Sequence, residues 1–267
     1  MITIPNVMPP LPRQKLWSRN LSPVDAFRWL GAGWRDFATR PVLSLAYGLL
    51  VFAISVAIVF GLFVFNLDYI LFPALAGFMV VGPLLAIGLY EKSRRLAAGL
   101  PVSLSAMIFV RPASNGQVLF TGVLLCLLML LWMRAAVIVY ALFFGLRPFP
   151  GLDHIMPVLF GAPVGWAMLC VGGAIGGLFA AFSFAVSAVS IPMLLNERVD
   201  ALTAMGSSVA YVWHNLPAML VWGGIVLTFF LLSLATGLIG LIVAFPVLGH
   251  GTWHAYRAVR PGRGDAK

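Results

Sequence analysis

Charged residues are scarce in this chain: Asp, Glu, Lys and Arg make up 9% of its 267 residues, against about a quarter in soluble domains. Apolar residues make up 61%, and they gather in long runs separated by short polar connections. None of these connections is long enough to bury a core of its own. The scarcity of charge therefore excludes an ordinary soluble domain and predicts a single integral membrane domain.

Sequence motifs for chemistry are missing as well. The two cysteines, Cys126 and Cys170, lie inside apolar runs and have neither metal-ligand nor disulfide spacing. The sequence contains no nucleotide-binding loop, no catalytic triad and no paired-carboxylate pattern. We therefore expect a protein that is not an enzyme and that holds no cofactor.

The charge that is present is mostly basic, with 17 Lys and Arg against 8 Asp and Glu. Apart from Arg134 and Arg147, the basic residues lie in the amino-terminal arm, two connecting loops and the tail. This distribution is typical of cytoplasmic flanks beside anionic lipid, and no separate basic domain exists to bind nucleic acid. We predict a multi-pass protein of the bacterial inner (cytoplasmic) membrane, with both termini cytoplasmic and an anionic inner leaflet beside them.

Six apolar segments predict an all-α bundle of about six transmembrane helices, because a helix of ~20 residues crosses the bilayer. Pro83 lies inside the second segment and predicts a kink there. The segments form one domain, residues 21–260, between a disordered arm (1–20) and a basic tail (261–267). The predicted spans are about 42–65, 70–90, 118–146, a fourth run ending near residue 195, 217–235, and a sixth run that ends in 245–257.

A helix in the membrane interface is predicted before the first span. Ser22 caps it, Pro23 occupies its first position and Asp25 its third. Its apolar residues recur at helical spacing and are expected to face the lipid: Phe27, Leu30, Trp34 and Phe37. Short elements at about 100–116 and 196–215 precede the third and fifth spans in the same way. The pattern favours three repeated units, each an interfacial helix followed by a two-helix hairpin.

Two stretches that end apolar segments resemble each other, GPLLAIGLYEKSRR at 82–95 and FPVLGHGTWHAYR at 245–257. Pro83 aligns with Pro246 and Gly88 with Gly251. On GPLLAIGLYEKSRRL, the TAM…WHNLP passage and FPVLGHGTWHAYR, the chain resembles a family of predicted bacterial integral membrane proteins of unknown function. The likeness covers about residues 20–260, and it implies a membrane protein without implying an activity.

The histidines are the candidate ligands. His250 and His254 are four residues apart, so on a helix they share one face, and His214 is expected at the same level of the membrane. Two imidazoles at this spacing can bind a metal ion or serve a haem. The alternative is that they are polar residues of the interface, bonded to backbone or headgroups.

Three further candidate positions carry charge. Arg134 lies inside an apolar run, where charge marks either a functional site or a side chain that extends to the headgroups; counting ~20 residues from Val118 places it near the outer boundary. Glu91 can pair with Arg94 or Arg95 as a helix-end ion pair, or form a cation site. Arg257 lies one turn beyond His254.

The sequence favours a non-catalytic protein that acts as an accessory or assembly partner of a larger membrane complex. A small-molecule or ion transporter or channel is the first alternative, suggested by the repeats and the kinked helices. A metal- or haem-binding membrane protein that uses His250 and His254 is the second.

Overall fold

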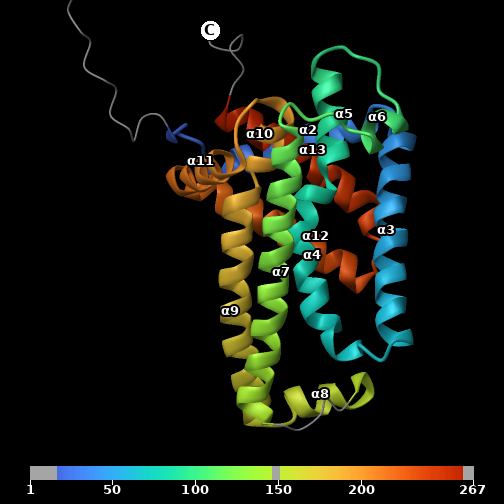
Figure 1. The fold of residues 1–267 in the computed structure, drawn as a ribbon, viewed down its shortest axis with the longest axis vertical. Coiled ribbons are helices and arrows are strands. Elements are labelled where there is room, and N and C mark those ends of the chain that lie inside the picture. The colour runs from blue at the N-terminus through green and yellow to red at the C-terminus, as the bar shows by residue number, and fades with distance from the viewer. Residues whose placement is uncertain (1–16, 146–150, 261–267) are drawn as a thin grey trace, which may run out of the picture.

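The computed structural model describes residues 17–145 and 151–260, apart from the side chains of 152 and 153. The predicted arm up to residue 16, Arg147 and the tail after residue 260 lie outside them. All regular structure in the described residues is helical, which confirms the all-α prediction. In chain order the helices are α2 (Pro23–Ala38), α3 (Pro41–Val64), the 3-10 helix η1 (Asp68–Ile70), α4 (Leu71–Leu85), α5 (Ile87–Ala97), α6 (Leu104–Ile108), α7 (Asn115–Phe144), α8 (Leu152–Phe160), α9 (Pro163–Ser187), α10 (Ser190–Asn196), α11 (Ala201–His214), α12 (Leu216–Ala235) and α13 (Leu241–Val259) (Figure 1).

Within residues 17–145 and 151–260, five helical stretches are long and apolar enough to cross a membrane, one fewer than the six predicted. They are α3, η1 to α5 (Asp68–Ala97), α7, α9 to α10 (Pro163–Asn196) and α12. The second of these is interrupted at Ala86, three residues after Pro83, where the kink was predicted. The predicted sixth span, α13, is not among them, because two histidines and an arginine make its second half too polar.

The hairpin formed by α12 and α13 turns back before it reaches the far end of α3. A side chain on Gly48 would collide with the backbone of Ile242, so the first turn of α13 lies against α3 at this point. Gly48 is about 10 Å along α3 from its start, whereas α3 is about 36 Å long. In Figure 1 the orange-red hairpin accordingly turns back above the α3–α4 turn. The start of α13 therefore packs beside the first half of α3, and α13 is the one predicted span that does not meet the length and composition of a crossing among the described residues.

The three predicted units pack on one another in a ring. The returning segment of each unit contacts the interfacial element of the next: α5 packs on α6, α10 on α11, and α13 on α2. The three returning segments α5, α10 and α13 also contact each other. The two ends of the described chain meet here, since Arg19 Nε donates to the carbonyl of Val259 at 2.8 Å. The contacts thus support the three-unit description and bring both chain ends to the same side.

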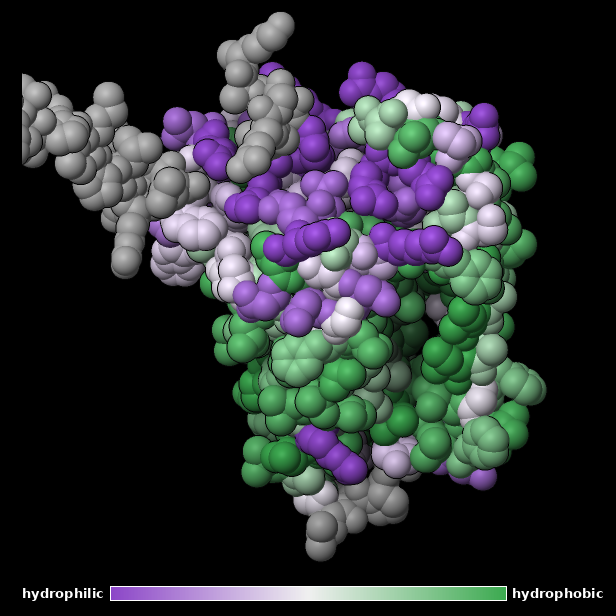
Figure 2. Space-filling view, turned by 45° about the horizontal axis from the view of Figure 1, so that its top comes forward, coloured by the Kyte–Doolittle hydropathy of each residue, from purple (hydrophilic) through white to green (hydrophobic). Residues whose placement is uncertain are grey.

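The best-packed core lies where these returning segments meet. We call α2, α5, α10, α11 and α13 the cap. Most of the large side chains that are fully buried belong to α5, α10 and α13, among them Leu89, Tyr90, Leu194 and Trp253. In contrast, 17% of the most apolar window is buried in each of the first three candidate spans. Figure 2 shows hydrophilic residues gathered over the cap and an apolar surface below it.

Helix α2 begins as predicted, with the Ser22 N–H donating to Asp25 Oδ2 at 2.8 Å. Its predicted lipid face is split, however: Phe37 is buried, whereas Phe27 and Trp34 are 58% and 54% exposed. The cause is the close approach of α2 to α13, where a Cβ on Gly33 would lie 2.6 Å from the backbone of Gly251. The expectation of one continuous lipid-facing stripe is therefore wrong.

Candidate functional site

Six polar side chains from four helices meet inside the cap. They come from α2, α3, α5 and α13, and three of them, Lys92, Ser44 and His250, have no exposed surface. The six residues are Asp36, Ser44, Lys92, Ser93, His250 and His254. Buried polar groups of this kind are stable only when each finds a hydrogen-bond partner.

The partners form a directed chain. Lys92 Nζ donates to Ser44 Oγ at 2.8 Å, and an ammonium group can only donate. The Ser44 hydroxyl is then left to donate to His250 Nε2, which is 3.0 Å away. With Nε2 accepting, the neutral ring carries its hydrogen on Nδ1 and donates it to Ser93 Oγ at 2.8 Å. Ser93 is hydrogen-bonded in turn to the Asp36 carboxylate, so the chain runs from a buried ammonium to a carboxylate.

The two ends of this chain differ in their access to water. His254 Nε2 lies 2.9 Å from Asp36 Oδ2, and their side chains are 31% and 18% exposed. Burial acts to raise the pKa of Asp36, but hydrogen bonds from His254 and Ser93 outweigh it and hold the pKa below its usual value. Burial, together with the charge of Lys92, lowers the pKa of His250 to about 3. His250 is therefore neutral at physiological pH, as the directed chain requires.

The candidate metal ligands are only partly brought together. His250 and His254 join one network, but both ring nitrogens of His250 bond to serine hydroxyls and His254 bonds to Asp36. His214 lies on α11, where its Nδ1 bonds to the carbonyl of Ala210. Within residues 17–145 and 151–260, no three His, Cys, Asp or Glu side chains gather closely enough to hold a metal. Of the three histidines, His214 bonds to backbone, as the alternative to a metal site expected, whereas His250 and His254 bond to side chains.

The helix-end ion pair predicted for Glu91 is present. Its carboxylate, 2% exposed, accepts from Arg94 Nη2 at 2.7 Å and from Arg95 Nε at 2.6 Å. Arg257 lies in the last turn of α13 and is half-buried.

Arg134 is exposed on α7. Trp132, two residues earlier, donates its Nε1 hydrogen to the carbonyl of Pro73 at 3.0 Å. Because Pro73 lies in the first turn of α4, Arg134 lies level with the α3–α4 turn, near the outer end of the span. This placement agrees with an arginine that extends to the headgroups.

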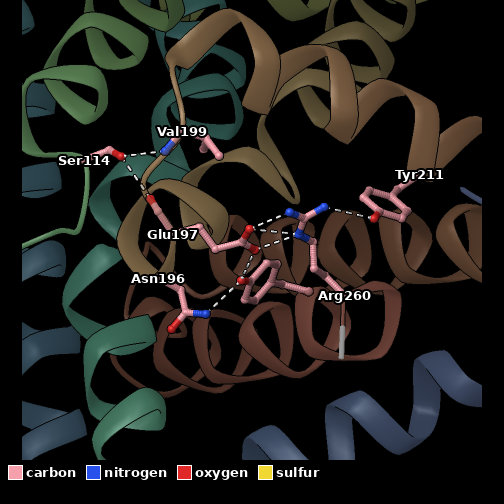
Figure 3. A network of polar contacts seen from close by, with 7 residues as sticks. Ser114, Asn196, Glu197, Val199, Tyr211 and Arg260 are labelled. Atoms are coloured by element: carbon pink, nitrogen blue, oxygen red, sulfur yellow. Dashed lines mark hydrogen bonds and ion pairs between the residues drawn. The ribbon is translucent and has the colours of Figure 1, made fainter. Parts of the chain in front are cut away.

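A second polar network closes the cap and was not anticipated from the sequence (Figure 3). Arg260 Nη2 donates to Glu197 Oε2 at 2.6 Å, and the Tyr256 hydroxyl donates to Glu197 Oε1 at 2.8 Å. Burial, and then the charge of Glu197, raise the pKa of Tyr256. Ser114 Oγ donates to the Glu197 carbonyl at 2.9 Å, which joins the start of α7 to the loop after α10. The network fixes three distant segments together, so its role is structural.

At the opposite end of the molecule, a cavity of about 880 Å³ lies between the α3–α4 turn and helices α7, α8 and α9. Its lining is mostly apolar, with polar groups from Asp68, Tyr69, Trp132 and Tyr140. This size is within the range of small-molecule sites.

A family model described as "Predicted integral membrane protein (DUF2189)" matches residues 71–196. The match includes GPLLAIGLYEKSRRL but not the TAM…WHNLP or FPVLGHGTWHAYR passages, so it is shorter than the predicted 20–260. No curated protein and no solved structure matches the chain. The segment from α4 to α10 is thus similar to a family of predicted integral membrane proteins of unknown function, as the sequence resemblance implied.

Proposed function

We propose that this protein is an accessory or assembly partner of a larger complex in the bacterial inner membrane, and that α3 binds a transmembrane helix of another subunit. The observation that carries the proposal is the uneven packing of α3. Its buried residues are Ser44, Tyr47, Gly48 and Val51, all in its first half. From residue 52 to 64 the helix has no buried residue, although this is the half that extends furthest from the cap.

The second half of α3 has a surface that suits a partner helix. Ala53, Ala57 and Gly61 follow at four-residue spacing, so they lie along one face. In lipid, helices associate mainly through close packing, and small residues at this spacing allow it. Larger side chains beside that face are well exposed, with Ile58 at 56% and Phe60 at 68%. Figure 2 shows a hollow between α3, at the right, and the rest of the apolar surface.

The cap supports this role because it fixes α3 at one end. Ser44 of α3 takes part in the directed chain, and Tyr47 donates its hydroxyl hydrogen to the carbonyl of Leu85 at 2.8 Å. The first half of α3 is thus held by α5 and α13 and by the end of α4, while the second half is available to a partner. In this proposal both termini are cytoplasmic and the cap lies at the inner leaflet, as the positions of the basic residues indicate.

The test is site-specific photocrosslinking in the membranes of the host cell. A photoreactive residue at Phe60 should give one discrete crosslinked protein that also co-purifies stoichiometrically in mild detergent. Ala57→Leu should remove most of this product, whereas Ala174→Leu, a matched change at an exposed position of α9, should leave it unchanged. Crosslinking to lipid alone, or a product insensitive to Ala57→Leu, would contradict the proposal.

The cavity beside α8 favours transport or binding of a small molecule as a second candidate. An amphipathic solute could occupy its apolar walls and bond to Asp68 or Tyr69. Uptake of a solute by vesicles that contain the purified protein, abolished by Asp68→Asn or by a bulky residue at Gly172, would support this function instead.

A further inference from the structure

A shallow pocket of about 340 Å³ at the edge of the cap carries an unusual amount of positive charge. It is lined by two arginines of α5, Arg94 and Arg95, and by Arg111 from the loop after α6, together with Ser105 and Phe109. Glu91 also borders it, but this one carboxylate faces three guanidinium groups. The pocket therefore has a net charge of about +2, which suits a polar anion.

Glu91 orients two of the arginines without using all of their donors. It accepts from Arg94 Nε and Nη2 and from Arg95 Nε, and it is itself 2% exposed. Arg95 Nη1 donates to the carbonyl of Pro101 at 3.1 Å. Arg94 Nη1 and Arg95 Nη2 then have no acceptor among the described residues. Both side chains are 31% exposed, so these free donors can reach a ligand in the pocket.

Arg111 adds a third guanidinium that is exposed and, within the part of the chain that the structure describes, has no hydrogen-bond or ion-pair partner. Ser105 contributes a hydroxyl, 3.0 Å from Ser103 Oγ. Forked N–H donors with a neighbouring hydroxyl are the groups that bind the oxygens of a phosphate.

The position of the pocket indicates where such a phosphate comes from. Arg94 and Arg95 lie at the end of the candidate span Asp68–Ala97, the level at which lipid headgroups are found. Apolar side chains next to the pocket are exposed, with Ile108 at 47% and Phe109 at 77%. A ligand that meets both surfaces has an anionic head and an apolar tail.

We propose that this arginine pocket binds the phosphate of an anionic phospholipid headgroup, with the acyl chains beside Ile108 and Phe109. A soluble phosphate would use the same donors but would leave these apolar side chains in water. The inference does not depend on the proposed accessory role, because it concerns a different face of the molecule.

The test is native mass spectrometry of the full-length protein in non-ionic detergent with added phosphatidylglycerol. Arg111→Gln should weaken retention of one lipid roughly fivefold, the effect of one arginine near an anionic lipid. Arg198→Gln, the same change at an exposed position of the loop between α10 and α11, outside the pocket, should leave retention unchanged. Equal thermal unfolding of both variants would show that each is folded.

Three results would overturn the inference. Equal loss of lipid in Arg111→Gln and Arg198→Gln would mean that only overall charge matters. Equal retention of phosphatidylcholine would mean that the pocket does not select anionic lipid. Displacement of the lipid by millimolar inorganic phosphate would assign the pocket to a soluble anion.

Discussion

The cap and the far halves of the membrane helices are built on different physical principles. In the cap, short helices from three units bury large side chains and two polar networks, and contacts such as Ser44–His250 join residues 206 positions apart. In the far half of α3 no residue is buried, and its stability comes from its own backbone hydrogen bonds in lipid. An apolar sequence is therefore enough to insert these helices, whereas the polar residues of the cap determine how they are arranged.

The largest effect is expected from His250→Ala. This change takes the imidazole partner away from the buried hydroxyls of Ser44 and Ser93 and opens a cavity, so the free energy of unfolding should fall by about 3–5 kcal/mol. Leu178→Ala, at a position of α9 that is 72% exposed, should change it by less than about 0.5 kcal/mol. Thermal unfolding in the same detergent measures both, and similar losses would remove the distinction between cap and spans.

Acid should weaken the cap in a defined pH range. Because the pKa of His250 is lowered from 6.5 to about 3 in the folded protein, the unfolded chain binds more protons between these values. Stability is then complete above about pH 6.5 and falls by up to about 1.4 kcal/mol per pH unit below it. The lowered pKa of Asp36 acts in the same direction, but only as the pH falls below 3.8, the usual pKa of an aspartate. In His250→Gln the loss between pH 6.5 and 4.5 should largely disappear, and an unchanged pH profile would contradict the assignment.

Gly33→Ala should separate α2 from α13. Its new methyl group would lie 2.6 Å from backbone atoms of Gly251 and Val247, and backbone cannot move aside, so we expect a loss of about 1–3 kcal/mol. The matched control is Gly206→Ala in α11, where nothing lies within 4 Å of the added atom and the higher helix propensity of alanine should stabilise by up to about 1 kcal/mol. Opposite signs of the two shifts in melting temperature support the close packing, and equal signs argue against it.

The smallest effect is expected at the edge of the cap. The Arg260 and Glu197 side chains are 38% and 23% exposed, so a double-mutant cycle with Arg260→Gln and Glu197→Gln should give a coupling of about 1 kcal/mol. The Arg28–Asp25 pair, in which the arginine side chain is 74% exposed, should give close to zero. A larger coupling at the second pair would mean that burial does not set the strength of these ion pairs.

The features that the sequence predicts well are local ones. The Ser22 cap, the break after Pro83 and the pairing of Glu91 with Arg94 each depend on residues at most four positions apart. The site in the cap could not be found in this way. His254 pairs with Asp36, 218 positions away, and that contact exists only because α13 packs on α2. Lys92 looked like part of a basic flank, because nothing near it in sequence shows that three helices would enclose it.

The depth of the last hairpin was missed for a similar reason. Residues 217–235 have the length and apolar character of a crossing, and the first half of α13 is similarly apolar. Their depth is set by Gly48, whose missing side chain lets α13 pack beside the first half of α3. Composition along one segment carries no information about such a contact with another.

Distance measurements between spin labels test most directly whether the cap is fixed while the far half of α3 is free. One pair, at Arg28 and Leu202, lies on exposed positions of the cap, and the other, at Phe60 and Leu131, lies on the exposed far parts of α3 and α7. For the purified protein in detergent, pulsed electron paramagnetic resonance should give a narrow distribution for the cap pair. The Phe60–Leu131 pair should give a broad one, because few contacts restrain that half of α3. Equally narrow distance distributions for both pairs would show that the far half of α3 is as fixed as the cap, which contradicts the proposed difference between them.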